Sequence, residues 1–351
     1  MDMKTLKTAV VGLGRIGWYT HIPEILKRGG QLALVAVVDV SQERLEEAKQ
    51  AYGVRGYTKI EQMIQSEKPD LIVIATPTHL HYEHACTAMR MGVDVFLDKP
   101  MTVDYAAACA VAQCARETGR KLMVFQPHRA CAAVNQLKHI IDTGRIGKLI
   151  SIHFTRTDYA CRADWQAFQK FGGGMLNNYG AHHIDSLVHM AQDRVNRLYC
   201  SKDIVAAAGD AEDVVKIVFQ TYKGITLQID INQAAALAGP AWVIYGQDGA
   251  IISEESPEGK LQFRMRWFDP GKLPPITASE SLAAANRSYG EDLVIPWEEE
   301  VIPEDSRYEI DFYEKVCEYF AEDKAPYVPI EESLYVMELI QRCHKDAAQD
   351  Q

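Results

Sequence analysis

A glycine-rich turn near the amino terminus is the feature that most constrains the fold of this chain. Gly12-Leu13-Gly14-Arg15-Ile16-Gly17 follows an apolar run at residues 8–12 and opens a segment of helical periodicity at residues 16–28. A Gly-x-Gly-x-x-Gly sequence between a strand and a helix is typical of a dinucleotide-binding βαβ unit. The first glycine allows a tight turn, the second lets a diphosphate approach the backbone, and the third lets the helix pack on the strand. The alternative is a tight glycine turn that binds nothing.

The first 125 residues continue this alternation of strands and helices. Strands are predicted at residues 8–12, 32–39, 71–75, 94–97 and 121–125. Helices are predicted at residues 16–28, 42–51, 59–66, 81–91 and 103–117. Because the strands are almost continuous in Val, Ile, Leu and Ala, they are typical of parallel strands buried on both faces. The pattern predicts that residues 1–125 form a doubly wound α/β domain of the Rossmann type.

Residues 126–351 show a different pattern, which predicts a second domain of α+β type. Strands are predicted at residues 149–156, 196–201, 214–221, 226–232, 242–245, 251–254 and 261–267. Helices are predicted at residues 132–142, 175–190, 308–321 and 330–344, and the last two can pack back on the first domain. Alternation such as Gln228-Ile229-Asp230-Ile231-Asn232 gives each strand one apolar face, which indicates an antiparallel sheet. Residues 268–303, rich in Pro, Gly and Glu, are predicted to form a long surface excursion.

Composition narrows the possible partners. A length of 351 residues suits two domains, and a net charge of -11 argues against nucleic acid or an anionic membrane as a partner. We see no signal peptide and no apolar run of the roughly 20 residues that a membrane span needs. None of the eight cysteines forms a Cys-x-x-Cys pair. Reduced thiols and a cytoplasmic location are therefore expected.

The end of the second predicted strand indicates which dinucleotide is bound. Asp39 lies 22 residues after Gly17, close to the spacing of the acidic residue that binds the ribose. A carboxylate there accepts hydrogen bonds from the ribose hydroxyls and repels a 2′-phosphate. We therefore expect NAD rather than NADP.

A lysine follows another predicted strand of the first domain. Asp98-Lys99-Pro100 comes directly after the strand at residues 94–97, at the sheet edge where a Rossmann domain holds the nicotinamide ring. The ammonium of Lys99 could exchange a proton with a substrate hydroxyl while the ring exchanges a hydride, which points to alcohol dehydrogenation. The alternative is a surface lysine beside a turn proline.

Together, several motifs resemble the Gfo/Idh/MocA family (glucose–fructose oxidoreductase, inositol dehydrogenase and rhizopine catabolism). They are Gly12 to Gly17, Thr76-Pro77 with His81, Asp98-Lys99-Pro100 (usually Glu-Lys-Pro), Gly172-Gly173-Gly174 followed by His182 and Asp185, and Tyr308-Glu309. The resemblance covers almost the full length. It implies a Rossmann domain with an open-faced antiparallel sheet domain, and oxidation of ring hydroxyls of sugars and cyclitols. It also implies a homodimer or homotetramer joined through the sheet face.

The resemblance also implies roles for two proton-transferring residues. Lys99 would be the general acid/base, with a pKa lowered by burial and by a cationic nicotinamide. His182 would be the second, with Asn178 four residues earlier on the same helical face. An aspartate often stands at this position in the family, and the pair can relay the substrate proton. Because an asparagine cannot accept a proton, Lys99 and His182 must share this work here.

Further residues are expected to line the cleft. Thr76, Pro77, His81 and Asp98 would lie beside the cofactor with Arg15, Ile16 and Lys99. Arg129, Tyr159, Arg162, Trp165 and Asn178 would bind the substrate, and ordinary packing between domains is the alternative for the first four. His183 is expected to be a packed core histidine. No metal is expected, since neither His79, His81 and His84 nor His182-His183 with Asp185 matches a known metal-site spacing.

The sequence thus predicts an NAD-dependent dehydrogenase of a sugar, glycoside or cyclitol. One alternative is a glycosidase with retained NAD, which oxidises a sugar transiently to labilise a neighbouring bond. Another is a sensor that binds NAD and a sugar without turnover.

Overall fold

A twisted sheet of six parallel strands forms the first domain. The computed structural model describes residues 5–274, 280 and 294–348. The strands are β1 (Leu6–Val11), β2 (Leu32–Val38), β3 (Arg55–Tyr57), β4 (Leu71–Ile74), β5 (Asp94–Leu97) and β6 (Leu122–Val124). They lie in the order β3-β2-β1-β4-β5-β6, as in a Rossmann domain. The five predicted strands are confirmed. The sequence did not predict β3, because its three residues, Arg-Gly-Tyr, contain no apolar run.

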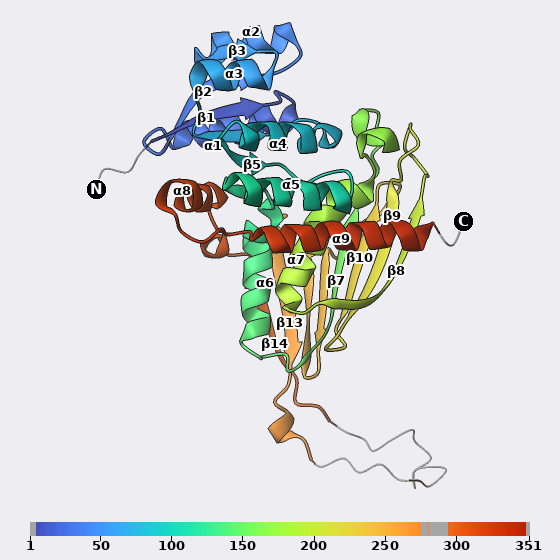
Figure 1. Cartoon of the computed structure of the whole chain (residues 1–351). Helices are drawn as coiled ribbons and strands as arrows, with labels where there is room; N and C mark the ends of the chain where they lie inside the picture. Colours follow the sequence, from blue (N-terminus) through green and yellow to red (C-terminus); the bar gives the residue numbers. More distant parts are fainter. Residues whose placement is uncertain (1–4, 275–279, 281–293, 349–351) are drawn as a thin grey trace.

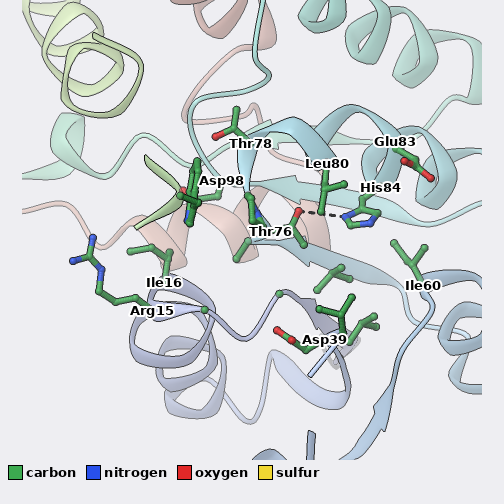
Figure 2. A pocket seen from close by; sticks show the side chains of 18 of the residues that line it. Arg15, Ile16, Asp39, Ile60, Thr76, Thr78, Leu80, Glu83, His84 and Asp98 are labelled. Atoms are coloured by element: carbon green, nitrogen blue, oxygen red, sulfur yellow. Dashed lines mark hydrogen bonds between the residues drawn. The ribbon is translucent and has the colours of Figure 1, made fainter. Parts of the chain in front are cut away.

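Helices cover this sheet and leave a pocket at its carboxyl edge. They are α1 (Ile22–Lys27), α2 (Gln42–Tyr52), α3 (Ile60–Glu67), α4 (His81–Arg90) and α5 (Tyr105–Thr118). Ser41 caps α2 by accepting a hydrogen bond from the Arg44 N–H, and Gly119 ends α5 in a left-handed conformation. The ends of β1, β2, β4 and β5 surround the pocket drawn in Figure 2. In an open α/β sheet this edge is where ligands bind.

The second sheet has eight strands and is mostly antiparallel. They are β7 (Leu149–Thr157), β8 (Val195–Asp203), β9 (Val214–Thr221), β10 (Thr226–Asn232), β11 (Trp242–Gly246), β12 (Gly249–Glu255), β13 (Leu261–Trp267) and β14 (Glu298–Pro303). Their order is β14-β13-β12-β11-β7-β10-β9-β8, and among the described strands of this second sheet only β7 and β10 pair in parallel.

The predicted surface excursion is wrong at its carboxyl end. Strand β14 pairs with β13 at the edge of the second sheet. Its glutamates are exposed and its last residue is Pro303, and charge and proline are both typical of an edge strand. Most of the remaining prediction, residues 275–279 and 281–293, lies outside the described residues.

In the described part of the chain that follows β6, four α-helices are present: α6 (Ala132–Asp142), α7 (Ala181–Ala191), α8 (Phe312–Glu322) and α9 (Ile330–Ala347). Figure 1 shows α9 running past α5 and α7, and α9 also contacts β8. The predicted helix at residues 175–190 divides into a π turn, η6 (Leu176–Gly180), followed by α7. None of the helices in the described ranges is long and apolar enough to cross a membrane.

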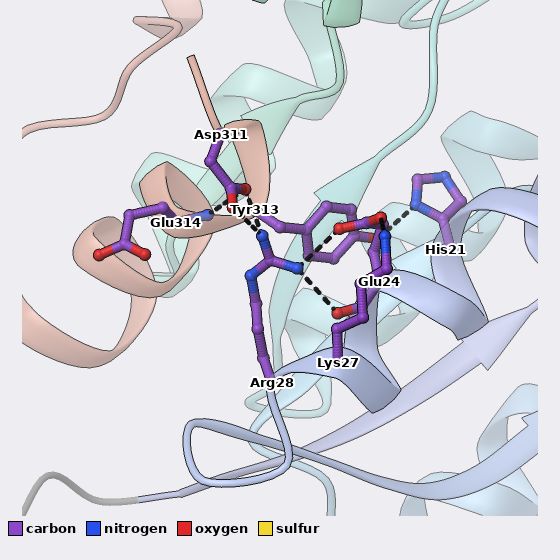
Figure 3. A network of polar contacts seen from close by, with 7 residues as sticks. All are labelled: His21, Glu24, Lys27, Arg28, Asp311, Tyr313 and Glu314. Atoms are coloured by element: carbon purple, nitrogen blue, oxygen red, sulfur yellow. Dashed lines mark hydrogen bonds and ion pairs between the residues drawn. The ribbon is translucent and has the colours of Figure 1, made fainter. Parts of the chain in front are cut away.

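Helix α8 packs on the first domain rather than on the second sheet. Arg28 at the end of α1 forms an ion pair with Asp311, the N-cap of α8, and another with Glu24 (Figure 3). The Tyr313 hydroxyl lies 2.6 Å from His21 Nδ1. Phe312 stacks on Phe96 of β5, with ring centroids 6.0 Å apart. The same buried cluster thus contains residues from β5 and from α8, far apart in the sequence.

Candidate active site

The glycine turn after β1 is as tight as its sequence requires. Gly12 has φ of +99°, and a Cβ there would lie 2.6 Å from the carbonyl oxygen of Ala75. A Cβ on Gly17 would lie 2.0 Å from the carbonyl oxygen of Gly12. Gly14, in contrast, has open space where its Cβ would stand and lines the pocket. Gly12 and Gly17 are therefore needed for the turn itself, whereas Gly14 leaves room for a ligand.

Asp39 holds the same turn from the end of β2. One carboxylate oxygen accepts the Leu13 N–H at 2.8 Å, and the other accepts the Ser41 N–H at 2.9 Å. The guanidinium of Arg44 lies 3.5 Å from the first oxygen. Each carboxylate oxygen has a second lone pair, so Asp39 can also accept from a ribose.

The pocket is a cavity of about 830 Å³ between the two domains. Figure 2 shows Arg15 and Ile16 beyond β1, and Thr76, Thr78 and His84 beyond β4. Of the residues expected at the cofactor, Gly12, Gly14, Arg15, Ile16, Asp39, Thr76, Pro77, Asp98 and Lys99 line it. Of those expected at the substrate, Arg162, Trp165 and Asn178 line it.

His81 lies behind the pocket wall, contrary to its expected place in the lining. Its ring nitrogens face the carbonyl oxygens of Thr76, at 2.8 Å, and of Pro100, at 3.0 Å. Burial lowers the pKa of His81 to about 4. His81 therefore ties the loop after β4 to the loop after β5, and His84, one turn later on α4, lines the pocket instead.

Lys99 stands at the inner end of the cavity with its charge poorly hydrated. Burial lowers the pKa of Lys99 to about 8, against the opposing charge of Asp98. Burial also raises the pKa of Asp98 to about 6. An Asp98 oxygen accepts the backbone N–H of Lys99 at 2.7 Å. A lysine with a pKa near 8 can gain and lose a proton close to neutral pH.

Asn178 binds Lys99 rather than His182. The Lys99 ammonium donates to the Asn178 backbone oxygen at 3.1 Å and to its Oδ1 at 2.8 Å. The Asn178 amide donates to Gln166 Oε1 at 3.2 Å. The spacing of four residues assumed one continuous helix, whereas Asn178 lies in the π turn η6 and His182 lies on α7.

His182 is buried beside these groups. Its ring stacks on His128 with centroids 3.9 Å apart, and its Nδ1 has no hydrogen-bond partner. Burial, and then the charge of Lys99, lower the pKa of His182 well below its ordinary value. His182 is therefore a neutral imidazole near Lys99, but it does not line the pocket. His183 stacks on Phe154 with centroids 3.8 Å apart, as a packed histidine would.

Two residues expected at the substrate lie elsewhere. Arg129 is buried in ion pairs with Asp185 and Glu332, so its donors are already used. Tyr159 is 67% exposed and is absent from the lining of the pocket. Both expectations came from position in the chain alone, which does not show where a side chain points.

Several residues near Lys99 were not predicted. Asp164 and Gln166 line the pocket, and Asp164 pairs with Arg162 at 3.1 Å. Arg156 on β7 donates to the Tyr179 hydroxyl at 3.0 Å. The only sequence indication was proximity: Asp164 and Gln166 flank Trp165, and Tyr179 follows Asn178. Among the described residues, no three His, Cys, Asp or Glu side chains gather in a way that could hold a metal ion.

The pocket fits a dinucleotide on three observations. Gly14 leaves open space at the turn where a diphosphate would lie, Asp39 stands at the end of β2 for a ribose, and Lys99 stands at the end of β5. These features define a nucleotide-dependent oxidoreductase of two domains.

Comparison of the sequence with known protein families shows to which family of oxidoreductases it belongs. The model described as "Oxidoreductase family, NAD-binding Rossmann fold" matches residues 6–126, and the "GFO/IDH/MocA C-terminal domain" matches residues 134–252. The chain belongs to the Gfo/Idh/MocA family of NAD-binding oxidoreductases.

Several curated relatives are named as dehydrogenases. A 1-carboxy-3-chloro-3,4-dihydroxycyclohexa-1,5-diene dehydrogenase from Comamonas testosteroni is 29% identical over 73% of this chain and 64% of its own length. The D-glucoside 3-dehydrogenase of Escherichia coli is 27% identical over 54% of this chain and 55% of its own. The scyllo-inositol 2-dehydrogenase (NAD(+)) of Bacillus subtilis is 30% identical over 51% of this chain and 52% of its own length. The chain thus spans between about half and two thirds of the length of these relatives.

Solved structures share the whole fold. An NAD-binding protein from Listeria innocua superposes with a TM-score of 0.85 at 23% identity, covering 99% of both chains. The WlbA dehydrogenase from Bordetella pertussis, in complex with NADH and UDP-GlcNAcA, superposes with a TM-score of 0.78 at 21% identity, covering 99% of this chain and 98% of its own. At these identities the likeness establishes the fold alone.

Proposed function

We propose that the protein oxidises a secondary ring hydroxyl of a sugar, glycoside or cyclitol with NAD, or reduces the corresponding ketone with NADH. The observation that carries this proposal is the Lys99 amine, held by two oxygens of Asn178 at the inner end of the nucleotide pocket. A primary amine at this place, with a pKa lowered to about 8, suits a general acid/base.

Asn178 prepares Lys99 for proton transfer. A neutral amine has two N–H bonds and one lone pair. If both N–H bonds are donated to the two Asn178 oxygens, the lone pair is left to accept the proton of a substrate hydroxyl. NAD, when bound, supplies the acceptor for the hydride that leaves the carbinol carbon. Because Asn178 is uncharged, it orients Lys99 without holding the amine in its protonated form.

The surroundings of Lys99 suit a ring with several hydroxyls. Besides Lys99, the pocket lining includes the polar side chains of Arg162, Asp164, Gln166 and Asn178. Arg162 lies 3.1 Å from Asp164, so its guanidinium has a nearby carboxylate. A neutral polyol can satisfy several such groups together, whereas a small linear alcohol would leave most unpaired. The named activities of the glucoside and inositol dehydrogenases support the same class.

A substrate panel tests this proposal. We expect pyranosides or inositols with NAD to give NADH, and ethanol and lactate to give none. Release of an aglycone without net NADH would identify the NAD-retaining glycosidase instead. Binding heat without either product would identify the sensor. Activity confined to linear alcohols or 2-hydroxy acids would contradict the substrate class.

The outer face of the second sheet supports a homodimer or homotetramer. Direct cross-strand partners form a row across all eight strands: Val301, Arg264, Ile252, Val243, His153, Gln228, Val218 and Tyr199. Tyr199 is 49% exposed, Val301 47% and Ile252 36%. We propose that a second copy covers this face. A monomer mass by light scattering at micromolar concentration would contradict it.

All eight cysteines are free in the structure. Unpaired thiols suit a reducing compartment, so we propose a cytoplasmic location. Cell fractionation, with the activity measured in each fraction, would test this.

A further inference from the structure

A line of polar side chains connects the carboxyl-terminal helix with the turn that holds Lys99. Lys202 on β8 lies 3.0 Å from His344 Nδ1 on α9. His344 Nε2 lies 2.9 Å from Asn177 Oδ1. The Asn177 amide donates to the backbone oxygens of Gly172, at 3.3 Å, and Gly173, at 3.0 Å.

The donor and acceptor groups of these side chains fix the direction of every hydrogen bond in this line. The Lys202 ammonium can only donate, so His344 Nδ1 accepts. His344 Nε2 then carries the proton and donates to Asn177 Oδ1, which leaves the Asn177 amide to donate to the glycine carbonyls. Only a neutral imidazole, in one tautomer, satisfies both of its neighbours. Burial, and then the charge of Lys202, lower the pKa of His344 to about 4, which is consistent with this state.

The line ends at the element that positions the general base. Asn177 and Asn178 are adjacent in the π turn η6, and Asn178 supplies both oxygens that bind Lys99. The glycine loop (Gly172, Gly173 and Gly174) also borders the nucleotide pocket, because a Cβ on Gly172 would lie 3.5 Å from Thr78 Cβ. A hydrogen bond that holds Asn177 in place therefore holds both the π turn η6 and the glycine loop.

Single π turns are rare and occur frequently at functional sites. Side chains from other elements hold this one in place. Here Glu212 accepts the Leu176 N–H at 3.1 Å at one end, and Asn177 is held by His344 in the middle. Without His344, the Asn177 amide oxygen would lose the N–H that donates to it while remaining buried.

We infer that His344, acting through Asn177, is a positioning residue that holds the Asn178 oxygens in place for Lys99. This inference rests on the proposed dehydrogenase activity. It assigns to helix α9 a part in the reaction, although His344 does not line the pocket. The titratable and charged groups near Lys99 include Asp98, Arg162, Arg15, His128 and His182, none of which belongs to this line.

Two variants of His344 separate positioning from simple packing. His344→Leu removes both hydrogen bonds, whereas His344→Gln keeps one acceptor for Lys202 and one donor for Asn177. We expect His344→Leu to lower kcat about tenfold or more, with KM for NAD unchanged, because a small displacement of a catalytic group is costly. His344→Gln should recover kcat to within about threefold of the wild-type value, the factor expected when the same interactions are kept.

The dependence of kcat on pH gives a second measurement of the effect of the His344 variants. It is measured with the best substrate of the pyranoside and inositol panel. A loosened turn would admit water to Lys99, so the rise of kcat with pH should move to higher pH in His344→Leu and return in His344→Gln. Asp346→Ala is the matched control, because Asp346 also joins α9 to β8, through the Cys200 N–H at 2.8 Å, without reaching Asn177. The Asp346→Ala variant should leave the dependence of kcat on pH unchanged.

Asn177→Ala completes the test. If His344 acts through Asn177, the double variant His344→Leu/Asn177→Ala should be no slower than Asn177→Ala alone. Additive losses, an unchanged profile in His344→Leu, or equal loss in Asp346→Ala would each overturn the inference. Failure of the proposed function would show differently, as a wild-type protein that gives no NADH with any member of the panel.

Discussion

The two walls of the cleft are built from different parts of the chain. The wall of the first domain is largely main chain: a glycine turn, the ends of parallel strands, and an aspartate that accepts two backbone N–H groups. The wall of the second domain is made of side chains, with Arg162, Trp165, Gln166 and Asn178 arriving from loops and a π turn. A main-chain wall recognises what all dinucleotides share. A side-chain wall can change with the substrate while the fold stays the same.

The largest effect should come from Lys99, where the two walls meet. Lys99→Ala removes the amine held by Asn178, and we expect turnover to fall by about 10² or more, the usual scale for a general acid/base. NAD binding, followed by fluorescence titration, should persist. Lys260→Ala, at an exposed position, is the control and should behave as the wild type. Near-normal turnover in Lys99→Ala would remove Lys99 from the mechanism.

Substitutions at Gly17 and Gly14 separate the two roles of the first-domain wall, which are to form the turn and to bind the cofactor. A Cβ on Gly17 would lie 2.0 Å from the Gly12 oxygen, so Gly17→Ala should lower stability by about 1–3 kcal/mol, the scale of overpacking. Gly14→Ala should leave the Tm of the unliganded protein unchanged and weaken NAD binding by about tenfold or more. Thermal unfolding with and without NAD measures both. An equal loss of Tm in the two unliganded variants would contradict the distinction.

Asp39 tests cofactor choice on the same wall. We expect the wild type to prefer NAD, and Asp39→Ala to narrow the preference by about tenfold, because the repulsion of a 2′-phosphate is lost. Affinity for NAD should fall as well, since the Leu13 and Ser41 N–H groups lose their acceptor. Arg44, 3.5 Å from Asp39, would then be free to bind the phosphate. The double variant Asp39→Ala/Arg44→Ala should therefore favour NADP less than Asp39→Ala alone in steady-state kinetics. A wild-type preference for NADP would show that Asp39 does not select the cofactor.

Asn178→Asp should have the smallest effect, a shift of the pH profile. A carboxylate beside the Lys99 ammonium raises the pKa of that lysine above its value of about 8. Since the deprotonated amine is the base, the rise in oxidation rate should move to higher pH, with activity kept at alkaline pH. The profile of kcat from neutral to alkaline pH is the measurement. A folded but inactive variant would mean that the Asn178 amide N–H, which donates to Gln166, is itself required.

The sequence predicted the first wall better than the second, for a physical reason. A glycine turn and a strand-end aspartate are local features, so Gly12, Gly14, Gly17 and Asp39 take the expected places. The partners of Asn178 depend on how η6 is wound, which the spacing of four residues misjudged. Arg129 was misplaced because its partners, Asp185 and Glu332, are distant in the sequence.

Within the fold, too, features with a strong local sequence pattern were predicted and features with a weak one were missed. Continuous apolar runs in the first sheet, and alternation of apolar and polar residues in the second, identified most of the strands. The two strands that were missed, β3 and β14, lie at sheet edges and have short or charged sequences. Edge strands need less apolar surface than central ones, so their sequences carry a weaker pattern.

The return of α8 to the first domain has a consequence for biosynthesis. Phe125 ends the predicted Rossmann segment, but the ring of Phe312 that packs on it, with centroids 5.0 Å apart, comes 187 residues later. At about 5–20 residues per second, a ribosome needs roughly 10–40 seconds to make that stretch. During this time the aromatic side chains of Phe96 and Phe125 would lack the helix that covers them. A nascent chain that pauses before residue 312 would therefore be a better chaperone client than the completed chain.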